Sequence, residues 1–137
     1  MKAKIRSKVG IYIGDPCYVL GGEDYDRACC REGLFVTKRG CFFTNKTYYG
    51  DGSYEGSDGV EYYVDSGTLG VIAGELIDGE MDDVTKEHSH YFECTDDYIE
   101  ALVKCEDGVF YILITQPSKP YVMEYTVRID TRWLVDE

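Results

Sequence analysis

Residues 101–114 read ALVKCEDGVFYILI, two mostly apolar runs separated by Glu106-Asp107-Gly108. The runs 101–105 and 109–114 have the length and the β-branched and aromatic content of strands. An Asp-Gly pair between two such runs indicates a tight hairpin, because glycine adopts the positive φ that the turn requires. The segment therefore predicts two neighbouring antiparallel strands, and the alternation of apolar and polar residues over 121–129 predicts a further strand.

Outside this hairpin the chain alternates short apolar runs with glycine-rich or polar breaks. Only two segments suggest helix. Residues 22–31 place acids early and bases late, which complements a helix dipole, and residues 73–76 suggest a single helical turn. The remaining apolar runs predict strands at 5–13, 34–37, 41–44, 47–49 and 60–65.

Two segments are predicted as loops. Residues 50–59 contain four glycines and predict a turn-rich loop or a tight hairpin, whereas residues 78–90 are polar and acidic and predict an exposed, mobile loop. The chain has no recurring strand–helix rhythm, so we expect a mainly β (α+β) fold, an antiparallel β-barrel or sandwich with one or two short helices. With 137 residues, it is expected to form a single domain over 1–137.

Cysteine usage and the N-terminus predict a cytoplasmic protein. The basic N-terminus is followed by only about five apolar residues before Gly14-Asp15-Pro16, which is too short for a signal peptide or a membrane anchor. The six cysteines include a vicinal Cys29-Cys30 pair and no C-x-x-C motif, so free, mostly buried thiols are expected instead of disulfides.

The net charge of −12 is concentrated in the middle of the chain. Residues 1–50 carry +4 and residues 101–137 carry −2, whereas residues 51–100 hold fifteen acids and one base, Lys86, for a charge of −14. Such a segment repels nucleic-acid backbones and attracts cations or basic protein surfaces. Direct nucleic-acid binding through it is therefore disfavoured.

Three glycine–aspartate motifs, GDPCY at 14–18, YGDGSY at 49–54 and VDSGTLG at 64–70, resemble those of small uncharacterised proteins of bacteria and their phages. The similarity covers residues 10–76. The resemblance implies a β-rich cytosolic protein of a kind that a phage could encode. It implies no chemistry and no site residues.

Two patterns come close to metal sites. Asp51, Ser53 and Glu55 occupy positions 1, 3 and 5 of a calcium-type loop with Gly56 at position 6, but position 12 is Tyr62. We therefore favour a β-turn with local hydrogen bonds over a divalent cation at Asp51, Ser53 and Glu55.

The second pattern is His88-Ser89-His90 followed by Cys94, which resembles part of a zinc or nickel site but has no local completion. We favour loop histidines and a buried cysteine here. No cofactor is expected.

An enzyme would have to use the glycine–aspartate turns, with Asp15, Cys17, Asp51 and Asp65 as candidate catalytic residues. Cys17 is the only cysteine on an evident turn, and Asp15 and Asp65 both lie at strand ends. The two histidines are more than seventy residues from Cys17. A small enzyme or metal-dependent ligand-binding module therefore remains the alternative hypothesis.

The leading hypothesis is an acidic protein-interaction module. Side chains on one face of a strand repeat at about 6.5–7 Å, close to two nucleotide rises, so alternating carboxylates can imitate a row of phosphates. Such a module is expected to occupy a basic, nucleic-acid-binding surface of a host defence protein, as a phage-encoded inhibitor would. The candidate partner-binding residues are Tyr54, Glu55, Asp58, Glu61, Tyr63, Asp65, Asp82, Asp83, Glu93, Asp96 and Asp97.

Overall fold

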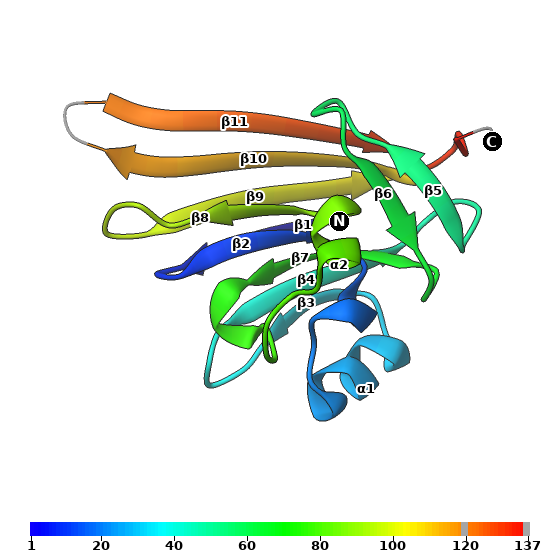
Figure 1. Cartoon of the computed structure of the whole chain (residues 1–137), viewed down its shortest axis with the longest axis horizontal. Coiled ribbons are helices and arrows are strands. Elements are labelled where there is room, and N and C mark those ends of the chain that lie inside the picture. The colour runs from blue at the N-terminus through cyan, green and yellow to red at the C-terminus, as the bar shows by residue number, and fades with distance from the viewer. Residues whose placement is uncertain (119–120, 136–137) are drawn as a thin grey trace.

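The computed structural model describes residues 1–118 and 121–135, and its strands form two antiparallel sheets and a ribbon (Figure 1). The four-stranded sheet has the order β1-β9-β10-β11, formed by Lys2–Ser7, Ile99–Glu106, Val109–Ser118 and Tyr121–Asp130. The five-stranded sheet has the order β3-β4-β7-β2-β8, formed by Gly33–Val36, Cys41–Lys46, Thr68–Ala73, Gly10–Gly14 and His90–Glu93. The predicted mainly β fold is confirmed.

The helical elements are short. They are α1 (Gly22–Cys30), α2 (Asp83–Glu87) and the single 3₁₀ turns η1 (Pro16–Tyr18) and η2 (Gly74–Leu76). The first helix and the turn at η2 were both expected from the sequence. Among the described residues, none of the helices has the length and apolar character needed to span a membrane.

The predicted hairpin is confirmed as β9 and β10. Phe110 pairs with Cys105 across it, and the turn residues Asp107 and Gly108 both have positive φ, 52° and 79°. Two consecutive positive φ values give the turn type whose twist matches that of the flanking strands. The strict alternation of buried and exposed residues along β9 places one face of this sheet against the core.

The two sheets pack through one apolar core. Its members include Ile5 of β1, Ile11 and Ile13 of β2 and Phe110 of β10, all with 1% exposure or less. A second, smaller cluster covers the other face of the five-stranded sheet, where Tyr12, Phe42 and Ile72 pack with residues of α1 and η2. The molecule therefore has a sandwich of two sheets with α1 on one outer face.

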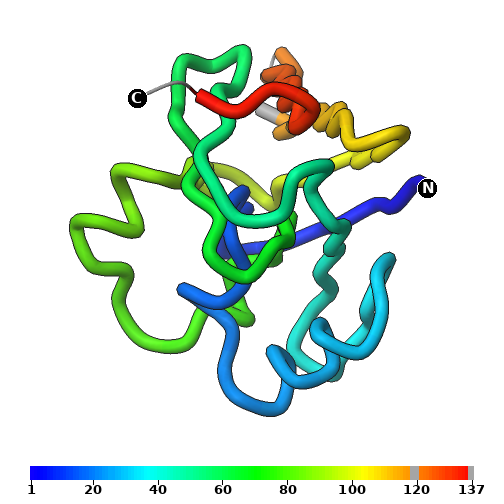
Figure 2. Tube along the Cα trace, turned by 90° about the vertical axis from the view of Figure 1, so that its right-hand side faces the viewer, coloured from blue at the N-terminus to red at the C-terminus, as the bar shows by residue number. Residues whose placement is uncertain are grey.

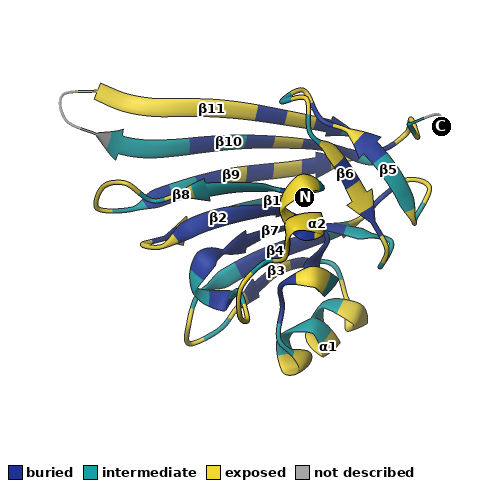
Figure 3. Cartoon of the chain, viewed as in Figure 1, coloured by how far each residue is buried: buried dark blue, intermediate teal, exposed yellow. Residues whose placement is uncertain are grey.

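The ribbon of β5 (Gly52–Glu55) and β6 (Glu61–Val64) closes one end of this core (Figure 1). Tyr54, Tyr62 and Val64 point inward and are completely buried, while the residues between them face outward (Figure 3). The ribbon is anchored to β11, because the Ser57 N–H donates to the Arg128 carbonyl at 2.9 Å.

The C-terminal segment lies beside this ribbon (Figure 2). The Val135 N–H donates to the Ser53 carbonyl at 2.9 Å, which adds a contact on the free edge of β5. The N-terminal half of β11, residues 121–126, is exposed on both faces (Figure 3). One end of the molecule is thus covered by several segments, whereas the hairpin of β10 and β11 extends away from it.

Three predicted elements differ from the structure. The expected strand 5–13 is divided into β1 and β2, because the Ser7 hydroxyl accepts from the Val9 and Gly10 N–H groups and forms a turn. Residues 47–49 are also a turn, in which the Thr47 hydroxyl donates to the Gly50 carbonyl at 2.6 Å. In both cases a local side-chain hydrogen bond replaced strand pairing.

The expected acidic loop at 78–90 contains α2 and the first residue of β8. Asp82 caps this helix, since its carboxylate accepts from the Thr85 N–H at 2.7 Å. These backbone and side-chain hydrogen bonds from Thr85 lower the pKa of Asp82. The cysteines are all free, as expected, but only Cys105 is buried, and Cys29 and Cys30 are exposed because α1 lies at the surface.

Candidate functional site: an acidic ribbon face

Two of the glycine–aspartate motifs meet at Asp15, which is completely buried. One of its carboxylate oxygens accepts from the Cys17 N–H at 2.8 Å and the Ser66 hydroxyl at 2.6 Å. The other accepts from the N–H groups of Asp65 and Ser66 at 2.6 and 2.8 Å. The four donors occupy the acceptor positions of this carboxylate, so its role is to fix the turn after β2 to the turn after β6.

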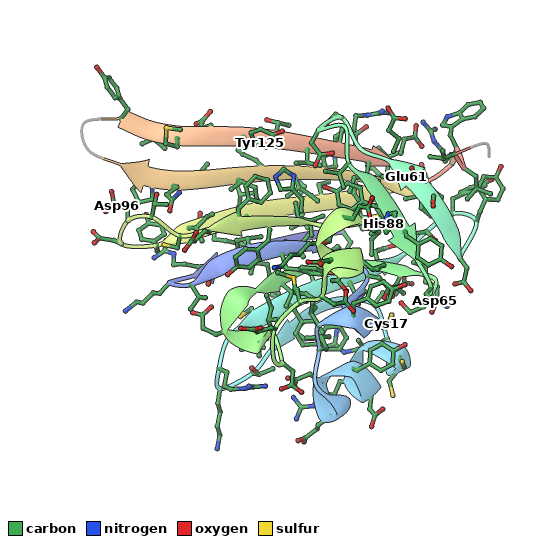
Figure 4. All side chains as sticks on the ribbon, in the orientation of Figure 1. Cys17, Glu61, Asp65, His88, Asp96 and Tyr125 are labelled. Atoms are coloured by element: carbon green, nitrogen blue, oxygen red, sulfur yellow. The ribbon has the colours of Figure 1, made fainter. Side chains whose placement is uncertain are left out.

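The other candidate catalytic residues lie near Asp15 but are not arranged for catalysis. Burial, reinforced by Asp15, raises the pKa of the Cys17 thiol well above its ordinary value, which disfavours the nucleophilic thiolate. Asp65 contributes its backbone to the cluster while its side chain is exposed (Figure 4), and Asp51 is exposed in the turn before β5. The geometry therefore supports a structural role for Asp15 and Cys17.

Asp51, Ser53 and Glu55 belong to the turn and strand that begin the ribbon. Ser53 is opposite Tyr63 and Glu55 is opposite Glu61 in the strand register, so these residues form part of a sheet surface. Within residues 1–118 and 121–135, no group of three or more His, Cys, Asp or Glu side chains has an arrangement suited to a metal ion.

Two of the predicted partner-binding residues are buried. Tyr54 has no exposed surface, and its hydroxyl donates to the Gly50 carbonyl at 2.8 Å. The Asp58 side chain is also inaccessible, because it accepts from the Tyr62 hydroxyl at 2.5 Å and lies 2.7 Å from Nδ1 of His90. The prediction that Tyr54 and Asp58 contact a partner is therefore wrong, since both hold the ribbon in place.

The pair of Asp58 and His90 was not anticipated from the sequence. His90 stacks on Phe92 with 4.0 Å between ring centroids, and Tyr125 of β11 meets it edge-on at 5.7 Å. Burial and the hydrogen bond to Asp58 raise the pKa of the Tyr62 phenol. The cluster joins the ribbon to one edge of each sheet, and a pairing between residues 32 positions apart leaves no local signal in the sequence.

The outward side of the ribbon is acidic. Glu55 and Glu61 are directly opposite each other in the register, and both are exposed. Tyr63 of β6 is also exposed, and so is Asp65 in the turn that follows the strand (Figure 4). These four residues, with the three acids of α2 and its cap, are called here the acidic ribbon face: Glu55, Glu61, Tyr63, Asp65, Asp82, Asp83 and Glu87.

Contacts of His88 bring α2 against β6. Its Nδ1 lies 3.1 Å from the Glu61 carbonyl oxygen, and its ring centroid is 6.0 Å from that of Tyr63. Lys86, the single base of the acidic segment, lines a different hollow with Met81 and Tyr91. No ion pair within the described residues involves an acid of the acidic ribbon face.

The remaining candidate residues, Glu93, Asp96 and Asp97, are exposed but lie elsewhere. Asp96 is in the turn between β8 and β9, at the opposite end of the molecule from Glu61 and Asp65 (Figure 4). The candidate acids therefore do not all supply one row of carboxylates, because Asp96 lies far from Glu61 and Asp65. The strand ladder separates the segment into an acidic ribbon face and a distant acidic turn.

Comparison with known proteins found no family model, no curated protein and no solved structure that matches this chain.

Proposed function

We propose that this chain is a protein-interaction module that binds a basic surface of a partner protein through the acidic ribbon face. The observation that carries the proposal is the cross-strand pair of Glu55 and Glu61. Like charges directly opposite each other on a sheet destabilise it, and neither carboxylate forms an ion pair with another described residue. A feature that opposes folding without internal compensation is expected at a functional surface.

The shape of the acidic ribbon face favours a nucleic-acid-binding partner. Glu61 and Tyr63 follow one another on the outer side of β6 at a step of about 6.5 Å, close to two nucleotide rises, and the exposed Asp65 comes directly after the strand. Tyr63 is 41% exposed, and tyrosine in a charged setting is typical of interface anchors. The proposal extends to inhibition: by occupying the basic surface of a host defence nuclease, a phage-encoded module of this kind would exclude its nucleic acid.

The proposal is tested by capturing proteins from a bacterial lysate on the immobilised chain and on two charge-reversal variants. One variant changes the face, with Glu55→Lys, Glu61→Lys and Asp65→Lys. The matched control makes the same change of charge in the distant acidic turn and its strand, with Glu93→Lys, Asp96→Lys and Asp97→Lys.

We expect the wild type and the control to retain the same basic protein and the face variant to lose it. High salt should release that protein, because the Debye length falls from about 30 Å at 0.01 M to about 3 Å at 1 M. Duplex DNA should compete with the chain for it. Equal capture by the two variants, or capture that is independent of salt, would contradict the proposal.

A further inference from the structure

A basic hollow lies apart from the acidic ribbon face, formed by the turn between β1 and β2 and the turn between β3 and β4. It has a volume of about 620 Å³, and its bases are Arg6, Lys8, Lys38 and Arg39. Two carboxylates, Glu75 and Asp97, also line it, so the lining carries a net charge of +2 in a chain whose net charge is −12.

Hydroxyl side chains fix the shape of both turns. Ser7 accepts from the Val9 and Gly10 N–H groups at 2.9 and 3.0 Å. Thr37 accepts from the Arg39 and Gly40 N–H groups, each at 3.2 Å, and donates to the Gly40 carbonyl at 2.8 Å. The backbone positions that carry Lys8 and Lys38 are thus ordered before any ligand binds, which lowers the entropic cost of binding.

The two arginines are also held in place. Nε and Nη2 of Arg6 contact Glu100 at 3.0 and 2.9 Å, and its guanidinium lies 4.1 Å from the Tyr98 ring centroid. Arg39 contacts Asp24 through Nη2 at 3.2 Å. Both carboxylate partners lie outside the lining, and each guanidinium has five N–H donors, so donors remain for a ligand in the hollow.

Lys8 and Lys38 supply the positive charge of the hollow that is available to an anion. Neither forms an ion pair with another described residue. Glu75 does not neutralise the Lys8 side chain through a contact, because its carboxylate is occupied by the Ser7 hydroxyl and by the Lys8 backbone N–H at 3.2 Å. The lining of the hollow therefore includes two lysines without an ion-pair partner among the described residues and two arginines whose guanidinium groups are oriented by Glu100 and Asp24.

We propose that this hollow binds a compact, multiply charged anion, namely the diphosphate group of a phosphorylated small molecule. Its volume is within the range of about 300–1,000 Å³ that is typical of ligand sites. A longer polyanion such as a nucleic acid is less suitable, because Asp97 in the lining and Asp96 beside it would repel the phosphates that extend past the bases.

The test is a calorimetric titration with inorganic pyrophosphate at low ionic strength. The site variant is Lys8→Ala with Lys38→Ala, and the matched control is Lys2→Ala with Lys104→Ala, the same loss of charge from neighbouring strands of the four-stranded sheet. Thermal unfolding of each variant verifies that it is folded. We expect saturable binding by the wild type and the control, and a loss of about a hundredfold in affinity for the site variant, about tenfold for each lysine contact removed.

Three outcomes would overturn the proposal. They are the absence of saturable binding to the wild type, equal losses in the two variants, and a short single-stranded oligonucleotide that displaces pyrophosphate and binds more tightly than it. The last result would identify a nucleic-acid groove. Retention of affinity in Lys8→Arg with Lys38→Arg would support the compact-anion site, because the positive charges are kept.

Discussion

Asp15 follows β2 and Glu61 begins β6, and the hydrogen bonds from Asp65 and Ser66 to Asp15 tie these two segments together at one end of the sandwich. The surroundings of the two carboxylates are nevertheless opposite. Asp15 is buried and accepts four hydrogen bonds, whereas the Glu61 side chain is exposed and faces another glutamate across the ribbon. The first carboxylate accepts from partly buried backbone N–H groups of two turns. The Glu61 carboxylate forms no ion pair with a described residue, so the needs of the fold do not explain a glutamate at this position. The contrast separates acids that build the structure from acids that are available to a partner.

The largest effect is expected for Asp15→Ala. The substitution leaves the N–H groups of Cys17, Asp65 and Ser66 without their acceptor, so the free energy of unfolding should fall by about 3–5 kcal/mol. Urea denaturation at neutral pH measures the loss. Asp65→Ala is the control, because its exposed side chain should change stability by no more than about 0.5 kcal/mol. Similar losses in the two variants would refute the structural role of Asp15.

Asp58→Ala should have the second largest effect, about 2–4 kcal/mol. It removes the acceptor of Tyr62 and His90, which are buried and half-buried, and of the Val60 N–H. Hydrogen exchange should show that β5 and β6 lose protection before the β9–β10 hairpin, because Asp58 holds the ribbon to the sheets. Loss of protection in both regions together would indicate that the ribbon is not held separately.

Asp130 is an intermediate case, a surface carboxylate that is paired within the chain. Hydrogen bonds from the Arg132 guanidinium lower the pKa of Asp130 to about 2. Because the folded-state pKa lies below the unfolded value of about 3.9, the pairing stabilises the protein above that pH and is lost as the pH falls towards 2. Asp130→Asn should abolish this part of the pH dependence. The pair should contribute less than about 1 kcal/mol to the free energy of unfolding, because solvent screens it. Urea midpoints between pH 2 and pH 5 measure it, and unchanged dependence in the variant would contradict the assignment.

The sequence predicted features that depend on neighbouring residues. The hairpin at 101–114, the helix α1 and the turn at η2 follow from periodicity and turn chemistry. Segments such as 5–13 and 47–49 were misassigned because the hydroxyls of Ser7 and Thr47 form hydrogen bonds that compete with strand pairing. The short α2 was missed because a five-residue helix capped by Asp82 has no repeating apolar pattern.

The charge of the candidate site was predictable from the sequence, but the division of its acids into structural and exposed ones was not. The count of fifteen acids in residues 51–100 located the acidic ribbon face, and the basic first fifty residues contain the four bases of the hollow. No local pattern distinguishes Asp58, whose carboxylate contacts His90, from Glu61, whose carboxylate forms no ion pair with a described residue. That difference depends on which strands meet in the folded chain.

Glu61→Lys should have the smallest effect on folding and the most informative sign. It replaces a repulsive cross-strand pair by an attractive one with Glu55, so the free energy of unfolding should rise by about 0.2–1 kcal/mol. The same substitution should weaken capture of a basic partner, because it reverses one charge of the acidic ribbon face. A residue that only supports the fold would lower stability and binding together. Urea denaturation and capture measured on the same preparation separate the two cases, and a gain of stability without loss of binding would remove Glu61 from the proposed interface.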